Sequence, residues 1–135
     1  MLQPKKQKFR KQFRGTMGGM ASRGTTVALG DFGLKSMSGG WVSAAQIEAA
    51  RRTITHATRR KGKIWVRIFP DKPVTQKSAG VRMGGGKGDV AWFVSVVRPG
   101  RVLFEVAGVE PETAHKALKL AAAKLPVETR IVKRV

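Results

Sequence analysis

The chain has 135 residues, of which 27 are Lys or Arg and only 8 are Asp or Glu, giving a formal net charge of +19 and a pI near 11.7. Such an excess of positive charge favours binding to polyanions, with nucleic acid as the first candidate and an anionic membrane as the second. The absence of cysteine excludes disulfides and thiolate metal sites. No apolar run is long enough to span a membrane, and the basic N-terminus lacks the apolar core of a secretory signal, so we expect a cytoplasmic protein.

The length suggests a single domain over 1–135, in which 1–24 form a basic arm and 70–89 an extended loop. The arm contains seven Lys and Arg residues and no acid, a composition typical of interaction tails. Phe9 and Phe13 could either stack on bases or anchor the arm to its own domain. Residues 25–35 are strand-like but broken by Gly30 and Gly33, which indicates a short hairpin or a bulged pair.

A first helix is predicted to begin at the capping box formed by Ser43 and Gln46. Apolar residues then recur at helical spacing and predict a buried stripe, made by Ile47, Ala50, Ile54 and Ala57. We expect Gly62 to end this helix. The opposite face would collect Arg52, His56, Arg59 and Arg60. In an ordinary protein this face would only be solvated, but in so basic a chain it indicates a ridge that binds an anion.

Strand-like runs rich in β-branched and aromatic residues follow at 63–69, 90–97, 102–109 and 129–135. Pro99 and Gly100 are typical of a type II turn, so we expect 90–97 and 102–109 to pair as an antiparallel hairpin. A second helix is predicted from Pro111 to Pro126, with a buried stripe of Ala114, Ala117, Leu118, Ala121 and Leu125. These elements predict an α+β fold, a two-layer sandwich of mainly antiparallel sheet covered by two helices.

The segment 70–89 interrupts two predicted strands and has almost no residue for a core. It carries five glycines and four cations, Lys72, Lys77, Arg82 and Lys87. Loops of this length without structure of their own are usually functional or disordered, so we expect it to bind an anion. Its glycine-lysine run resembles a phosphate-binding loop, but Val81 and Gly88 stand where a Walker motif needs Gly and Ser or Thr. A phosphate-binding enzyme is therefore only the alternative.

No catalytic constellation is predicted. His56 and His115 are the only histidines and have no partner at metal-ligand spacing, and the eight acidic residues are scattered. We therefore expect a protein that is not an enzyme and that needs no metal or cofactor.

Several motifs cover essentially the whole chain: MLQPK at 1–5, QIEAARR at 46–52, IFPDKP at 68–73, VRMGGGKG at 81–88, PGRVLFE at 99–105 and LAAAKLP at 120–126. Together, and in this order, they resemble the family of the bacterial large-subunit ribosomal protein sixteen. The resemblance implies an α+β structural constituent of the large ribosomal subunit that supports translation and subunit assembly. Its implied place is near the peptidyl transferase region and the A-site and P-site tRNA. The implied partners are large-subunit rRNA, tRNA and other large-subunit proteins, with no membrane.

The same resemblance implies particular contacts. The residues implied to contact rRNA are Lys5, Lys6, Lys8, Arg10, Lys11, Arg14, Arg51, Arg52, Arg59, Arg60 and Lys63. The residues implied to contact tRNA or the RNA around it are Lys72, Lys77, Arg82 and Lys87. Some members are hydroxylated at the arginine of R-M-G, which makes Arg82 a candidate modification site. The chain departs from the family where basic residues are common, at Thr16, Gly18, Ala45, Gly85 and Glu128. A general cationic nucleic-acid-binding protein is the remaining alternative.

Overall fold

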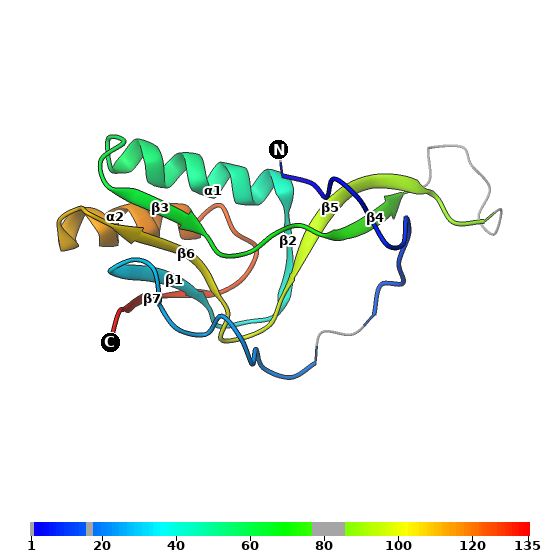
Figure 1. The fold of residues 1–135 in the computed structure, drawn as a ribbon, viewed down its shortest axis with the longest axis horizontal. Coiled ribbons are helices and arrows are strands. Elements are labelled where there is room, and N and C mark those ends of the chain that lie inside the picture. The colour runs from blue at the N-terminus through cyan, green and yellow to red at the C-terminus, as the bar shows by residue number, and fades with distance from the viewer. Residues whose placement is uncertain (1, 16–17, 77–85) are drawn as a thin grey trace.

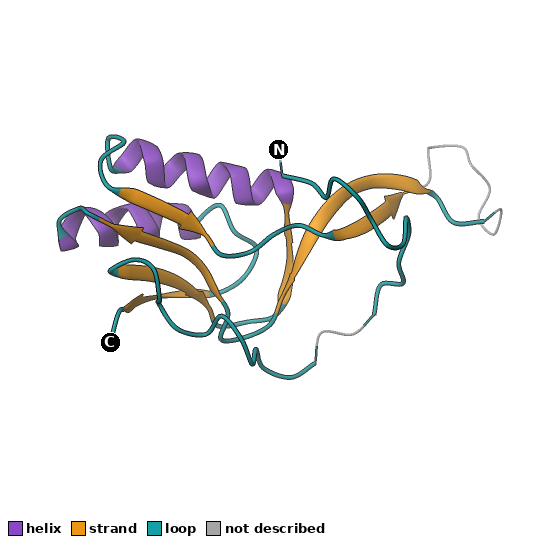
Figure 2. Ribbon diagram, in the orientation of Figure 1, coloured by secondary structure: helices purple, strands orange, loops and turns teal. Residues whose placement is uncertain are grey.

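The computed structural model describes residues 2–15, 18–76 and 86–135. Within these ranges the chain forms an α+β fold with two helices and two antiparallel sheets (Figure 1, Figure 2). In chain order the elements are β1 Phe32–Ser36, β2 Gly40–Ser43, α1 Ala44–Ala57, β3 Lys63–Val66, β4 Lys72–Gln76, β5 Asp89–Val97, β6 Val102–Ala107, α2 Pro111–Ala122 and β7 Thr129–Lys133. The predicted strands at 63–69, 90–97, 102–109 and 129–135 are thus confirmed as β3, β5, β6 and β7, with slightly different ends.

The first sheet has the strand order β3-β6-β1-β7, and both helices lie on one of its faces (Figure 2). The core between the layers is made by Phe104, Val106 and Leu34 from the sheet and by Ile47, Ile54 and Leu118 from the helices, all at most 1% exposed. Burying a side chain of this kind contributes roughly 1.5–3 kcal/mol relative to leaving it in water. The two apolar stripes expected from the sequence therefore face the sheet, with Ala57 and Leu125 half-buried at their ends.

The predicted capping box starts α1. The Ser43 hydroxyl accepts from the Gln46 N–H at 3.2 Å, and the Gln46 side chain accepts from the Ser43 N–H at 2.9 Å. The expected end is wrong, because α1 stops at Ala57, well before Gly62. Arg59 and Arg60 follow with φ of +53° and +62°, a left-handed conformation that costs an L-residue roughly 1–2 kcal/mol. These two arginines therefore lie on a turn after the helix and not on its exposed face.

The second sheet has the order β2-β5-β4, and its β4–β5 hairpin projects beyond the helices (Figure 1). The expected pairing of 90–97 with 102–109 is wrong, because β5 pairs with β2 and β4 whereas β6 pairs with β1 and β3. The turn itself forms, with Gly100 at φ +99° and the Arg101 N–H bonded to the Arg98 carbonyl at 3.3 Å. Ser36 at the end of β1 bonds to Gly100 and Arg101, both at 2.7 Å. The chain therefore crosses between sheets at this turn.

The segment 70–89 is not wholly a loop, which corrects the sequence prediction. Its residues 72–76 form β4, in register from Lys72 opposite Val94 to Gln76 opposite Asp89. Pro73 has no N–H to donate, and β4 accommodates it because it is an edge strand of the second sheet. The tip of the loop, 77–85, lies outside the described residues. Sequence reasoning also missed β2.

Glu105 is a fully buried carboxylate on the face of the first sheet opposite the helices. It alternates along β6 with Phe104 and Val106, which pack against the helices, so its side chain points the other way. One carboxylate oxygen accepts the backbone N–H groups of Ala28, Leu29 and Gly30 at 2.9, 2.8 and 2.9 Å, and the other pairs with Arg67. The segment before β1 is therefore held against the sheet. Of the two forms expected at 25–35, the hairpin is wrong, whereas β1 does pair with β6 in a ladder whose register shifts between Leu34 and Lys35.

Candidate nucleic-acid interface

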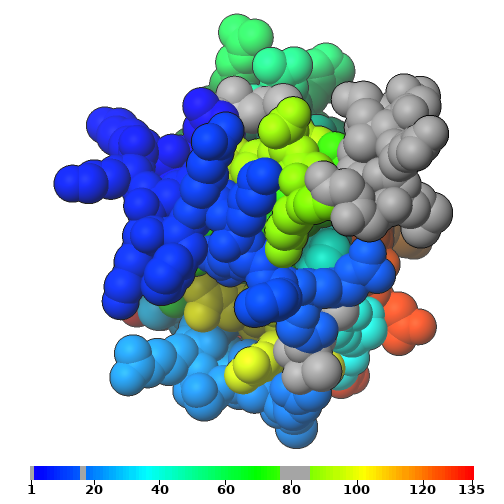
Figure 3. Space-filling model, turned by 90° about the vertical axis from the view of Figure 1, so that its right-hand side faces the viewer, coloured from blue at the N-terminus to red at the C-terminus, as the bar shows by residue number. Residues whose placement is uncertain are grey.

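The basic arm lies along the β4–β5 hairpin, so two segments that are distant in the sequence form one surface (Figure 1). Lys87 of the hairpin donates to the Gln12 carbonyl, and Lys72 donates to the Arg14 carbonyl. In return, Lys11 donates to the Lys87 carbonyl at 3.2 Å. Figure 3 shows the arm covering much of the face on which β5 appears. We call the surface made by residues 5–14, Lys72 and Lys87 the arm–hairpin surface.

Trp41, which sequence reasoning missed, lies against two cations of the arm–hairpin surface. The Arg14 guanidinium is 6.0 Å from the centroid of its indole ring, and the Lys72 ammonium is 5.1 Å from it. Cations over an indole face are stabilised by roughly 0.5–1 kcal/mol at exposed sites. The ring comes from β2, whose Trp41 pairs opposite Val96 of β5. The second sheet therefore supplies an aromatic support on which cations of the arm and the hairpin meet.

The arm's phenylalanines are exposed. Phe13 is 91% exposed and Phe9 is 62% exposed, so neither anchors the arm by burial. The Lys87 ammonium lies 5.3 Å from the Phe13 ring centroid, and the Lys8 ammonium lies 5.7 Å from that of Phe9. Of the two interpretations left open by the sequence, this exposure favours contact with a partner.

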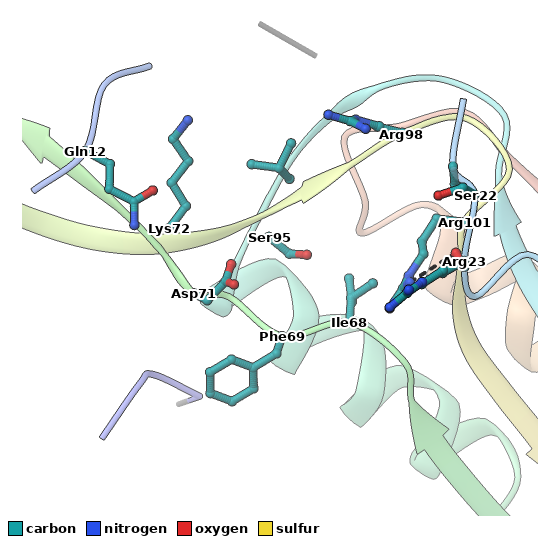
Figure 4. Close-up of a pocket in the computed structure, with 12 residues that line it drawn as sticks. Gln12, Ser22, Arg23, Ile68, Phe69, Asp71, Lys72, Ser95, Arg98 and Arg101 are labelled. Atoms are coloured by element: carbon teal, nitrogen blue, oxygen red, sulfur yellow. Dashed lines mark hydrogen bonds between the residues drawn. The ribbon is translucent and has the colours of Figure 1, made fainter. Parts of the chain in front are cut away.

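A hollow of about 680 Å³ lies beside the arm–hairpin surface (Figure 4). Among the residues that the structure describes, its lining includes Arg23, Lys72, Arg98 and Arg101 and one acid, Asp71. Arg101 donates to the Arg23 carbonyl at 3.1 Å and to the Arg67 carbonyl at 2.8 Å, which fixes its guanidinium at the edge of the hollow. A surface of this charge suits the phosphate backbone of a nucleic acid, because neutralising phosphates releases their condensed counterions.

The arginines predicted on α1 are paired with a carboxylate. Glu48 accepts from Arg51 and from Arg52, whose Nε lies 3.1 Å from its carboxylate. The hydrogen bonds from Arg51, reinforced by Arg52, outweigh partial burial and lower the pKa of Glu48 from 4.5 to about 2. The side chain of Arg52 remains 76% exposed and that of Arg51 41%. Both can therefore still meet a phosphate, but Glu48 offsets part of their charge.

A comparison with protein families identifies the chain. The model of the family Ribosomal protein L16p/L10e matches residues 4–132. The chain belongs to this family. It is 58% identical over 134 residues to the large ribosomal subunit protein uL16 of Psychrobacter cryohalolentis, an alignment that spans 99% of this chain and 98% of that protein. It is accordingly a structural, non-enzymatic constituent of the large ribosomal subunit, and it acts in translation in the cytoplasm.

The remaining predicted contact residues of this L16p/L10e chain lie in two places. Lys5, Lys6, Lys8 and Arg10 are exposed along the arm. Arg59, Arg60 and Lys63 are exposed around the turn between α1 and β3, at the end of the helix away from the arm (Figure 1). The 14 residues of α1 span about 21 Å, so this second group does not join the arm–hairpin surface. Lys77 and Arg82 lie outside the described residues.

The described residues hold no cluster of three or more potential metal ligands. His56 is exposed on α1, and the His115 ring packs edge-on against Phe32 with centroids 5.1 Å apart. Neither helix is long and apolar enough to cross a bilayer, a finding that covers the described part of the chain.

Proposed function

We propose that this L16p/L10e-family chain binds large-subunit rRNA through two separate cationic surfaces. One is the arm–hairpin surface, with Lys5, Lys6, Lys8, Arg10, Lys11 and Arg14. The other is the α1 surface, with Arg51, Arg52, Arg59, Arg60 and Lys63. Arg59, Arg60 and Lys63 lie at the end of α1 away from the arm, with Arg51 and Arg52 about halfway along the helix, so the two surfaces could meet different RNA segments. The observation that carries the proposal is that arm and hairpin cations converge by hydrogen bonds to main-chain carbonyls.

We further propose that the hairpin reaches tRNA, or the rRNA around it, through Lys72, Lys77, Arg82 and Lys87. The hairpin projects beyond the helical layer, which supports a reach of this kind (Figure 1). Arg82 is the proposed site of hydroxylation in this chain, on the strength of the R-M-G motif of the family.

The rRNA proposal is tested by measuring affinity for a structured large-subunit rRNA fragment as the salt concentration varies. The logarithm of the association constant should fall linearly with the logarithm of salt, with a slope of roughly −0.7 to −0.9 per phosphate contacted. Changing Lys5, Lys8 and Arg10 to Gln should weaken binding and make the slope shallower. Binding that does not respond to salt contradicts the proposal.

A matched control removes similar charge away from both surfaces. Lys116 and Lys119 are exposed on α2 and Lys124 is exposed just after it, and changing all three to Gln should leave affinity and slope nearly unchanged. Duplex DNA of equal length provides the competing case. If the DNA binds as tightly as the rRNA fragment, the chain is a general cationic nucleic-acid-binding protein.

A further inference from the structure

We propose that a small hollow beside Trp41 is a binding site for one backbone phosphate of the RNA, and that this phosphate joins the arm to the hairpin. The inference rests on the proposed function and specifies one point of contact within it. The hollow has a volume of about 210 Å³ and is lined by Gln12, Arg14, Trp41, Lys72, Pro73, Val74, Thr75 and Lys87. A water molecule occupies about 30 Å³ in the liquid, so the space suits a phosphate group with part of its sugar.

Among the described residues, the lining carries three cations and no acidic residue. Arg14 comes from the arm, whereas Lys72 and Lys87 come from the hairpin. None of the ion pairs among the described residues involves any of the three. Like charges repel by about 1 kcal/mol at 4 Å in water and by about 4 kcal/mol at an effective dielectric constant of 20. An anion bound between the cations attracts each of them, and this attraction offsets their mutual repulsion.

Hydrogen-bonding capacity remains for such an anion. The ammonium groups of Lys72 and Lys87 each donate to a carbonyl of the arm, which uses one of their three protons. The Arg14 guanidinium carries five N–H groups in a planar fork that suits a phosphate, and it already lies over the Trp41 ring. The Trp41 indole N–H is buried with no acceptor among the described residues. The cations are therefore positioned by carbonyls and an aromatic face, which leaves their charge available.

The position of the hollow gives the phosphate a second effect. The two bonds from Lys72 and Lys87 to the arm tie it to the hairpin across the same junction that the hollow occupies. A phosphate held by both Arg14 and Lys72 would add a third tie. Binding of RNA and docking of the arm should thus reinforce each other.

A double-mutant cycle tests whether Arg14 and Lys72 share one phosphate. We expect Arg14→Gln and Lys72→Gln each to lower affinity for the rRNA fragment about tenfold and to reduce the magnitude of the salt slope by roughly one phosphate's share. The double variant should lose much less than the hundredfold product, because the shared phosphate is already lost in either single variant. Losses that multiply would show that the two cations meet different phosphates and would overturn the proposal.

Two controls separate this proposal from the broader one. Lys5→Gln removes equal charge from the arm outside the hollow and should lower affinity only about two- to threefold. If Arg14→Gln costs no more than Lys5→Gln while the wild type keeps its steep salt slope, the phosphate site is wrong and rRNA binding stands. If the wild type shows no salt-dependent rRNA binding, the proposed function itself fails. Lys72→Arg keeps the charge and should keep most of the affinity, whereas a tenfold loss would contradict an electrostatic role.

The source of the phosphate is tested by NMR on the Trp41 indole N–H, assigned with a Trp41→Phe variant. The RNA fragment should shift this resonance in the wild type, and the shift should disappear in Arg14→Gln. Inorganic phosphate should produce a similar shift only at far higher concentration. If inorganic phosphate binds as tightly as the RNA, the hollow takes free phosphate and the assignment to the RNA backbone is overturned.

Discussion

The buried Glu105 carboxylate should be the most sensitive polar position in the fold. Changing it to Gln keeps the side-chain volume but removes the charge that accepts three backbone N–H bonds and pairs with Arg67. The new amide NH₂ would also face the donors of Arg67. Breaking a buried pair typically costs 3–5 kcal/mol, but the Arg67 side chain is 21% exposed and can regain some solvation. We therefore expect a loss of about 2–4 kcal/mol, a large part of the 5–15 kcal/mol of a typical domain.

The acid dependence of stability provides an independent signature of Glu105. Burial opposes its ionisation, but the hydrogen bonds from Gly30, Arg67 and Leu29 together outweigh burial and hold its pKa below 4.5. The pKa is thus lower in the folded than in the unfolded state. Its contribution is fully present above about pH 4.5 and is lost as the pH falls through the folded pKa. Wild-type stability should decline in this acid range, and the decline should be weaker in Glu105→Gln.

Urea unfolding followed by circular dichroism, near neutral pH and again below pH 4.5, measures both effects. The exposed Glu112→Gln is the matched control and should stay within about 0.5 kcal/mol of the wild type. Arg67→Met should cost much less in the Glu105→Gln background than in the wild type, because the pair is already broken. A loss below about 0.5 kcal/mol for Glu105→Gln would refute the reasoning.

Two further tests concern backbone conformation, and a third concerns the Glu48 carboxylate on α1. Gly62 has φ +74°, and an added Cβ would meet a carbonyl of β6. Gly62→Ala should therefore lower the free energy of unfolding in urea by about 2 kcal/mol or more. Gly18 has open space around it, so Gly18→Ala should not lower it. Arg59→Gly should raise the unfolding free energy by about 0.5–1 kcal/mol, because glycine adopts a left-handed φ without strain. The control Arg52→Gly, within α1, should lower the unfolding free energy by about 1 kcal/mol. A lower unfolding free energy in Arg59→Gly would contradict the strain argument. Glu48→Gln should release two arginines and raise affinity for the rRNA fragment, and unchanged affinity would show that their pairing does not compete with RNA.

Local patterns predicted the elements with strong signals of their own. The capping box at Ser43 and the apolar spacing from Ile47 located α1, and Pro111 located the start of α2. The strand β4 was missed because its residues are polar and interrupted by Pro73, which a sheet edge tolerates but which argues against a strand in the sequence alone. The end of α1 was misplaced because glycine is the usual left-handed residue, whereas here arginines adopt that conformation.

Local sequence patterns could not predict which strands pair when the strands are far apart in the chain. A Pro99–Gly100 turn normally joins neighbouring strands, and nothing local shows that Ser36 holds this turn where the chain changes sheets. The cations of the site could be named from charge alone. Their convergence on Trp41 could not, because it depends on how the arm crosses the second sheet. Glu105 was read only as part of a strand, although a lone acid within an apolar run such as VLFEV is a signal for a buried pair.

The position of β1 in the first sheet bears on how the chain folds as it is made. β1 lies between β6 and β7, with Phe32 opposite both Val106 and Lys133. Its two neighbours are therefore synthesised some 70 and 100 residues after it. Pairings so distant in sequence close slowly, because loop entropy is lost before any contact forms. The arm and β1 are synthesised before the other strands of the first sheet, and that sheet is complete only when Thr129–Lys133 has followed. Until then the basic arm is available to nucleic acid without the completed fold.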